Sequence, residues 1–126
     1  MKLNKLKPFA SFVVVQCKGG YAATTRAADK GEQGKIGLAG GKIDKGETSR
    51  QAVVREASEE GWDVSGVSLS PVHTAIVDGQ LVHWFSAKSA VIKTDFKEKG
   101  RIQPIVSNLN QLANSGYGND FLIDFI

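Results

Sequence analysis

Four glutamates lie in the short stretch between Gly41 and Trp62. On a helix with about 100° per residue, Glu56, Glu59 and Glu60 share one arc of the surface. Like charges at this spacing destabilise an isolated helix by about 0.2–0.5 kcal/mol per pair, so something must offset their repulsion. Mg²⁺ is held in proteins by a few carboxylates together with water and substrate phosphates. The pattern therefore indicates either a divalent-cation site or a solvated acidic helix face.

A helix over residues 49–60 is expected to carry these glutamates. Thr48 is a good N-cap residue, and Gln51, three positions later, completes a capping box. Neither proline nor glycine interrupts the segment, and Gly61 can adopt the left-handed conformation that ends a helix. The apolar arc that includes Val53 lies beside the acidic arc and is expected to face a sheet.

The rest of the chain predicts strands followed by helices. Asp78-Gly79 separates two apolar runs, which is a strong hairpin signal. Strands, a helix, a hairpin and further helices in this order predict an α/β fold with a mixed sheet. Two strands are predicted near the start, one over 11–17 and a second ending near Arg26. A long glycine-rich loop over 28–46 follows, around a short extended piece at 35–39. The other predicted elements are a helix with Pro104 in its first turn and Ile105, Leu109 and Leu112 on one face, and a short apolar element over 117–126.

Composition and charge narrow the class of protein. The chain has 126 residues, of which 41% are hydrophobic and 23% charged, which predicts one folded domain over residues 1–126. The net charge of +3 is dispersed along the chain, so a dedicated nucleic-acid-binding arm is not expected. Cys17 is the single cysteine, which excludes an intrachain disulfide and favours a reducing, cytoplasmic location. No apolar run is long enough to span a membrane.

The spacing of the charged residues resembles a known motif. Five residues separate Gly41 from Glu47, seven more lead to Arg55-Glu56, and Glu59-Glu60 follow after two residues. This is similar to the Nudix box, G-x5-E-x7-R-E-U-x-E-E-x-G-U, in which U is a bulky apolar residue. Six of the seven fixed positions agree, but Gly61 stands one residue early and Trp62 occupies the closing glycine position. We therefore expect the helix to stop one residue early and the next strand to be entered at a shifted position.

The resemblance implies an α/β/α sandwich with a mixed sheet. It also implies a hydrolase that uses Mg²⁺ or Mn²⁺ to cleave the phosphoanhydride of a nucleoside diphosphate linked to another group, most simply a (d)NTP. Arg55 would orient a glutamate, and Glu56 or Glu59 would take part in catalysis. The metal ligands that the resemblance implies are oxygen donors of the box, namely the carbonyl of Gly41 and the carboxylates of Glu56, Glu59 and Glu60, with Glu47 supporting the helix start or the outer shell of the metal.

Two residues outside the box are candidates by the same resemblance. Glu98, with Asp95 as the alternative, would supply a further acid from a loop after the central strands; a solvated lysine-rich loop is the competing interpretation. Arg26 would contact a phosphate, or would form a local ion pair. His73 and His83 lack companions at zinc-binding spacing. Trp84 and Phe85 alternate along a strand, so at most one of them could stack on a base.

Two other functions stay open at this point. The chain could be a nucleotide-sensing module of the same fold that does not cleave its ligand, although such modules usually lose the glutamates that are all present here. It could also hydrolyse RNA 5′ ends, which predicts a broad basic surface. The expected partner is a nucleotide, with nucleic acid and membrane not expected, and the chain could be a monomer or a homodimer.

Overall fold

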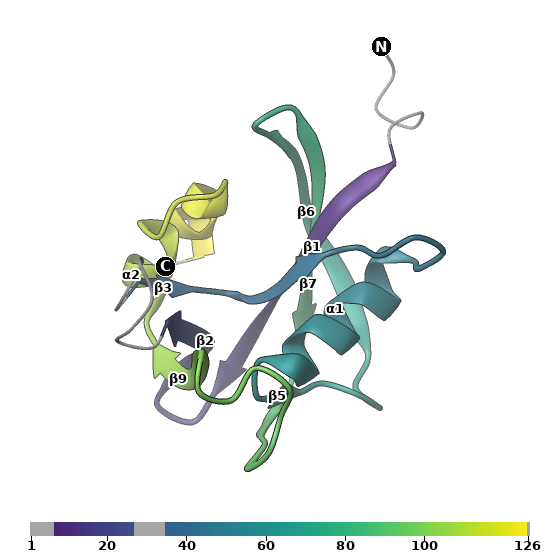
Figure 1. Ribbon diagram of the computed structural model, residues 1–126. Helices are drawn as coiled ribbons and strands as arrows, with labels where there is room; N and C mark the ends of the chain where they lie inside the picture. Colours follow the sequence, from purple (N-terminus) through teal and green to yellow (C-terminus); the bar gives the residue numbers. More distant parts are fainter. Residues whose placement is uncertain (1–6, 27–34, 126) are drawn as a thin grey trace.

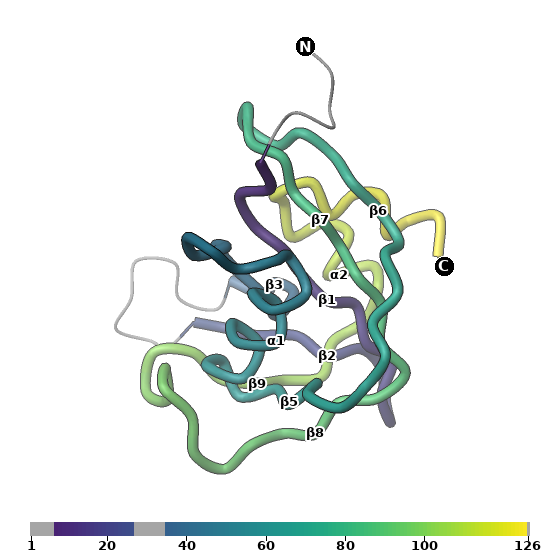
Figure 2. Tube along the Cα trace, turned by 90° about the vertical axis from the view of Figure 1, so that its right-hand side faces the viewer, coloured from purple at the N-terminus to yellow at the C-terminus, as the bar shows by residue number. Residues whose placement is uncertain are grey.

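The computed structural model describes residues 7–26 and 35–125. Seven strands form a mixed sheet in which β1 pairs with β7 in parallel and with β2 and β4 in antiparallel fashion (Figure 1). β5 and β8 pair separately and lie side by side near the bottom of the view in Figure 2. The elements in chain order are β1 Pro8–Cys17, β2 Gly20–Arg26, β3 Ile36–Gly37, β4 Ala39–Lys42, α1 Ser49–Glu59, β5 Trp62–Asp63, β6 Leu69–Val77, β7 Gln80–Ala87, β8 Val91–Ile92, β9 Ile102–Ser107, α2 Leu109–Ala113 and the 3₁₀ helix η2 Asn119–Phe125.

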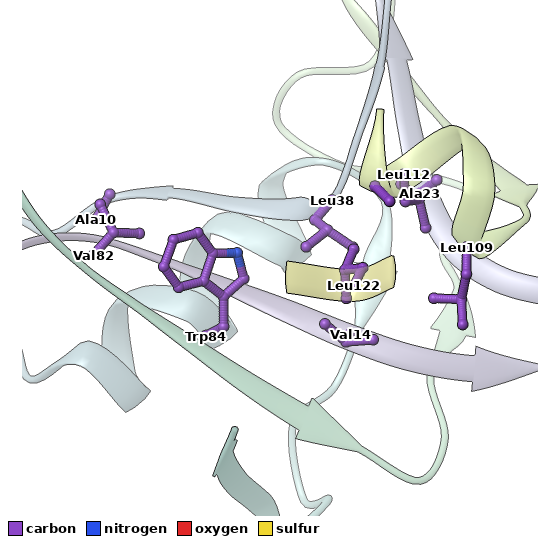
Figure 3. Packing of buried hydrophobic residues seen from close by; sticks show 10 residues of the cluster. Ala10, Val14, Ala23, Leu38, Val82, Trp84, Leu109, Leu112 and Leu122 are labelled. Atoms are coloured by element: carbon purple, nitrogen blue, oxygen red, sulfur yellow. The ribbon is translucent and has the colours of Figure 1, made fainter. Parts of the chain in front are cut away.

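The sheet is covered on both faces. Val53 and Ala57 of α1 pack with Phe85 on one face. On the other face Leu112 and Leu122, from α2 and η2, pack around Trp84 (Figure 3). Figure 1 shows α1 and the C-terminal helices on opposite sides of the strands. This arrangement confirms the predicted α/β/α sandwich.

Strand β1 runs through the middle of this sandwich. Val13 and Val15 belong to the cluster on the α1 face, whereas Val14 belongs to the cluster on the opposite face. Successive side chains of a strand point to opposite faces, so a strand covered on both sides needs a continuous apolar run. The run of valines meets this need, and the strand predicted over 11–17 is confirmed.

Trp84 and Phe85 follow the same rule on β7. Trp84 has 0% of its surface exposed and Phe85 has 5%, because each faces a different covered side of the sheet. The alternation of the two side chains is confirmed. Both are core residues, so neither presents a ring to a bound base.

The start of α1 is built as the sequence predicts. The Thr48 side chain accepts a hydrogen bond from the Gln51 N–H, and the Gln51 side chain accepts one from the Thr48 N–H. Glu60 is the C-cap residue and Gly61 follows with a φ of +99°. The capping box and the left-handed glycine end are both confirmed.

The β6–β7 hairpin is also confirmed. Asp78 and Gly79 both have positive φ, 50° and 80°, which is the conformation of a type I′ turn. A two-residue turn of this type fixes the register of the antiparallel pair from Val77↔Gln80 onward.

The helix predicted to begin at Pro104 is wrong. Residues 102–107 form β9, which pairs with β2 so that Pro104 lies opposite Thr24. In the described part of the chain β9 pairs with no strand on its other side, and an edge strand tolerates a proline that lacks an N–H. The helix begins only at Leu109, where the side chain of Asn108 caps it by accepting from the Gln111 N–H.

Candidate active site

Three carboxylates converge beside the C-terminal half of α1. Oxygen atoms of Glu56, Glu60 and Glu98 all lie within 4.8 Å of one another. Glu56 and Glu60 are one helical turn apart at the end of α1, and Glu98 comes from the segment that precedes β9. In Figure 1 this segment, drawn in green, passes the end of α1. We call these residues the three-carboxylate group.

Glu60 is the buried member of the group. Its side chain is 8% exposed, and its Oε1 accepts a hydrogen bond of 2.9 Å from the backbone N–H of Gly40. Burial, with smaller contributions from the nearby charges of Glu56 and Glu98, raises the pKa of Glu60 to about 8 against the opposing effects of the Gly40 hydrogen bond and the charge of Arg26. The protein alone therefore disfavours the ionised carboxylate.

The ionised form of Glu56 is disfavoured as well. Burial raises the pKa of its carboxyl group, against the opposing effect of Arg55, and Glu59 and Glu98 add repulsion. A divalent cation among these oxygens would stabilise their ionised forms. Hard oxygen donors are also what Mg²⁺ and Mn²⁺ prefer, so the three-carboxylate group fits the predicted cation.

Two glycines bring β4 up to these glutamates. A Cβ atom on Gly41 would lie 2.6 Å from Oε2 of Glu56, so a side chain there would force the carboxylate to move. Gly40 has a φ of +143°, and a Cβ there would lie 2.2 Å from the carbonyl oxygen of Ser11. The glycine pair therefore allows the backbone of β4 to approach both β1 and the carboxylates.

Arg55 organises the other glutamates of the box. Its Nε and Nη2 atoms donate to the two carboxylate oxygens of Glu47, and Nη2 also donates to the carbonyl of Lys42. Its Nη1 atom donates to Glu56 at 3.1 Å and to Glu59 at 3.2 Å. Arg55 therefore contacts one member of the three-carboxylate group and also ties residues 42–47, between β4 and α1, to the helix.

Glu47 and Glu59 lie on the Arg55 side of this network. The hydrogen bond from Arg55 lowers the pKa of Glu47, and the Asp44 N–H adds to this effect. Glu59 lies 3.9 Å from the Nζ of Lys97 as well as next to Arg55. Both residues are outside the three-carboxylate group, and the prediction that they bind metal stays a prediction.

The structure brings Glu98, and not the exposed Asp95, to the glutamates of the helix.

A pocket of about 440 Å³ opens beside the three-carboxylate group. Arg26, the predicted phosphate contact, lines it together with all three carboxylates, and Arg101 lines it too. Phe12 and Tyr117 form an aromatic pair in the same pocket, with ring centroids 5.5 Å apart. One pocket therefore combines acidic, basic and aromatic groups.

Sequence reasoning missed the aromatic part of the pocket. Tyr117 has a φ of +51°, which is uncommon for a residue other than glycine and often marks a functional position. Its flanking residues, Gly116 and Gly118, were the available signal. Asn119 lies beside it, and its side chain accepts a hydrogen bond of 2.9 Å from the indole N–H of Trp84.

Most of the chain matches a known protein family. Residues 5–99 match the family model described as the NUDIX domain. This chain belongs to the NUDIX family. The match confirms the Nudix resemblance and, at the level of the family, the predicted class of enzyme: a hydrolase acting on phosphoanhydride bonds.

Relatives of this family are similar to the chain either in sequence over a short stretch or in structure over nearly its whole length. The chain is 44% identical over 55 residues to the 8-oxo-dGTP diphosphatase of Escherichia coli K12, an alignment that covers 44% of this chain and only 38% of that protein. The solution structure of the E. coli ORF135 protein is similar with a TM-score of 0.65 and 20% identity, covering 99% of this chain and 93% of that one. A MutT structure from work on the Aliivibrio salmonicida and Vibrio cholerae proteins gives a TM-score of 0.67 and 20% identity, covering 94% and 98% of the two chains. At these identities the two structures show the fold alone.

The end of the Nudix box differs from the usual pattern, and the structure shows the consequence. Trp62 is 2% exposed and begins β5, and its indole N–H donates to the carbonyl of Ala23 at 2.7 Å. The tryptophan in the closing glycine position is therefore a core residue, and the turn is made by Gly61.

Among the described residues, no helix is both long and apolar enough to cross a bilayer.

Proposed function

We propose that this Nudix domain is a divalent-cation-dependent pyrophosphohydrolase of nucleotides, with nucleoside triphosphates as its substrate class. The observation that supports this proposal is the convergence of Glu56, Glu60 and Glu98 within 4.8 Å in a pocket that also contains Arg26. A phosphoanhydride carries dispersed negative charge, so its hydrolysis depends mainly on positioning and charge neutralisation. The pocket offers both.

Glu56, Glu60 and Glu98 would hold Mg²⁺ or Mn²⁺, with the Gly41 carbonyl beside them. When bound, the cation neutralises phosphate charge and makes water a better nucleophile at neutral pH. The chain prepares this site in two ways. The Gly40 N–H fixes the carboxylate of Glu60, and the guanidinium of Arg55 fixes that of Glu56.

The other groups of the pocket act on the substrate. We propose that Arg26 and Arg101 attract the phosphates, because guanidinium groups match phosphate geometry. The proton released by the attacking water would pass to a carboxylate oxygen of the three-carboxylate group. Phe12 and Tyr117 would contact the nucleoside, because an aromatic ring can pack against any base.

Two features favour this function over the alternatives. The four glutamates of the box are all present, and Glu56 and Glu60 line one pocket together with Glu98, which favours an enzyme over a sensing module. The 8-oxo-dGTP diphosphatase activity of the E. coli relative supports a nucleotide substrate and makes oxidised purine nucleotides the first compounds to test. For partners and location, we propose a monomer or homodimer in the cytoplasm that acts on free nucleotides.

The test is a panel of nucleotides assayed for nucleoside monophosphate and pyrophosphate with Mg²⁺, with Mn²⁺ and with EDTA. A 5′-triphosphorylated RNA oligonucleotide belongs in the same panel. We expect turnover of at least one nucleoside triphosphate, its loss in EDTA, and a drop of about 10²–10⁴-fold in Glu60→Gln and Glu98→Gln. Asp63→Asn is the matched control, because the Asp63 carboxylate accepts hydrogen bonds from Ser65 in its own turn and does not line the pocket. Nucleotide binding without turnover would favour the sensing module, and cleavage of the RNA alone would favour the 5′-end hydrolase.

A further inference from the structure

The segment that carries Glu98 is attached to the end of α1 by three hydrogen bonds. The Glu98 N–H donates to the carbonyl of Glu59 at 2.8 Å, and the Lys93 N–H donates to the carbonyl of Gly61 at 2.9 Å. The Nζ of Lys93 also donates to Oγ of Ser58 at 2.7 Å. The last carbonyls of a helix lack intrahelical partners, so such contacts complete its C-terminus. Residues 93–98 are thus held at both ends, and we call them the docked segment.

Gly61 follows α1 and lies against both the docked segment and β9. A Cβ atom on Gly61 would be 2.8 Å from Cγ of Pro104 and 3.2 Å from Cε1 of Phe96. Phe96 belongs to the docked segment, and Pro104 belongs to β9. Any side chain at position 61 would therefore clash with Pro104 and press on Phe96, which lies two positions before Glu98.

We propose that Gly61 is a positioning residue. Its lack of a side chain lets the docked segment lie directly on the C-terminal end of α1, and this docking brings the Glu98 carboxylate to those of Glu56 and Glu60. The docking stands on the contacts alone, whereas its effect on catalysis rests on the proposed function. Gly61 is also the residue at which this chain departs from the usual Nudix box, so the early glycine acquires a specific role.

The body of α1 does not depend on this contact. Its start is fixed by the capping box, and Val53 and Ala57 anchor it in the core with no exposed surface. A side chain at position 61 should therefore displace the docked segment while α1 stays folded. Gly61→Ala adds the Cβ, and Gly61→Asn adds it with a residue that tolerates the left-handed conformation more readily.

Gly66 provides a matched control. Its φ of +74° is also left-handed, but a Cβ there would meet no atom within 4 Å. Gly66→Ala and Gly66→Asn therefore impose the backbone strain without the contact. A difference between the variants at positions 61 and 66 isolates the contact.

The direct measurement is amide hydrogen exchange at Glu98, followed by NMR in the full chain. We expect exchange to be about tenfold faster or more in both Gly61 variants, with the Gly66 variants like the unmodified protein, because the Glu98 N–H then opens by local undocking. Equal exchange at Glu98 in all variants would overturn the proposal. So would the same acceleration in the variants at both positions, because strain alone would then explain it.

Kinetics test whether Gly61 acts through Glu98. Gly61→Ala should lower kcat in the otherwise unmodified protein and cause no further loss in Glu98→Gln, because both changes remove the same carboxylate from the site. Additive losses would contradict a role through Glu98. If no nucleotide is turned over, the proposed function fails, whereas the exchange at Glu98 still decides the docking.

Discussion

Arg55 holds Glu47 by two hydrogen bonds, Nε to Oε2 at 2.8 Å and Nη2 to Oε1 at 2.9 Å. The two residues are eight positions apart, on α1 and on the loop before it. Bidentate pairs of this kind combine charge with a fixed geometry. The pair therefore fixes the loop before α1 against the helix that carries the other glutamates.

Replacing Arg55 by lysine tests this role. A lysine keeps the charge but cannot make the fork, and it leaves the Lys42 carbonyl without its donor. We expect Arg55→Lys to lower the free energy of unfolding by about 1–3 kcal/mol in urea titrations. Glu47→Gln removes the charge from the same pair, so the double variant should lose less than the sum of the two single losses. Fully additive losses would show that the two side chains act independently.

Glu60 should make the stability of the metal-free protein depend on pH. Burial raises its pKa from 4.5 to about 8, so its contribution is fully present below the ordinary value and is lost as pH rises through about 8. In EDTA we expect the free energy of unfolding to fall as pH rises from 4.5 to about 8, by up to about 1.4 kcal/mol per pH unit for the one proton. Glu60→Gln should flatten the slope, as measured by urea unfolding at several pH values. An unchanged slope would contradict the assignment of this proton to Glu60.

Gly41 should be required for the position of Glu56. The Cβ of Gly41→Ala would lie 2.6 Å from the Glu56 carboxylate and push it aside. We expect weaker Mn²⁺ binding by calorimetry, by about 10–100-fold, as for other residues that support metal ligands. Gly37→Ala in the neighbouring strand is the control, because a Cβ there meets no atom within 4 Å. Equal Mn²⁺ affinity in both variants would remove the steric argument.

Trp62 should matter for stability and not for chemistry. Trp62→Phe removes the N–H that bonds to the buried Ala23 carbonyl and leaves a small cavity. We expect a loss of about 1–3 kcal/mol in the free energy of unfolding, with kcat for the best substrate close to that of the unmodified protein at a temperature where both are folded. A large fall in kcat without a loss of stability would place Trp62 in the site instead.

Local signals predicted the elements that are defined by neighbours in sequence. The capping box of Thr48 and Gln51 fixed the start of α1, and Asp78-Gly79 fixed a hairpin, because each depends on a few adjacent residues. The strand formed by residues 102–107 was missed for the opposite reason. Pro104 suits the first turn of a helix and also suits an edge strand, and the pairing of β9 with β2 decides between them.

In the site, too, local features were predicted and contacts between distant segments were not. The spacing within the box placed Glu56 and Glu60 on one arc of a helix. The proximity of Glu98 depends on a contact between segments about forty residues apart, and chain order alone suggested it only through the family resemblance. The separation of Glu47 and Glu59 from the three-carboxylate group depends on where Arg55 points, which no periodicity determines.

Titration with Mn²⁺, followed through the broadening of backbone amide signals in NMR spectra, directly tests whether the three-carboxylate group binds a divalent cation. If Glu56, Glu60 and Glu98 bind a divalent cation together, the first amides to broaden should be those of Gly40, Gly41, Glu60 and Glu98, and excess Mg²⁺ should restore them. The same titration of Glu60→Gln should need much more Mn²⁺. Broadening centred on Asp44 and Glu47, or no saturable broadening at all, would contradict the account.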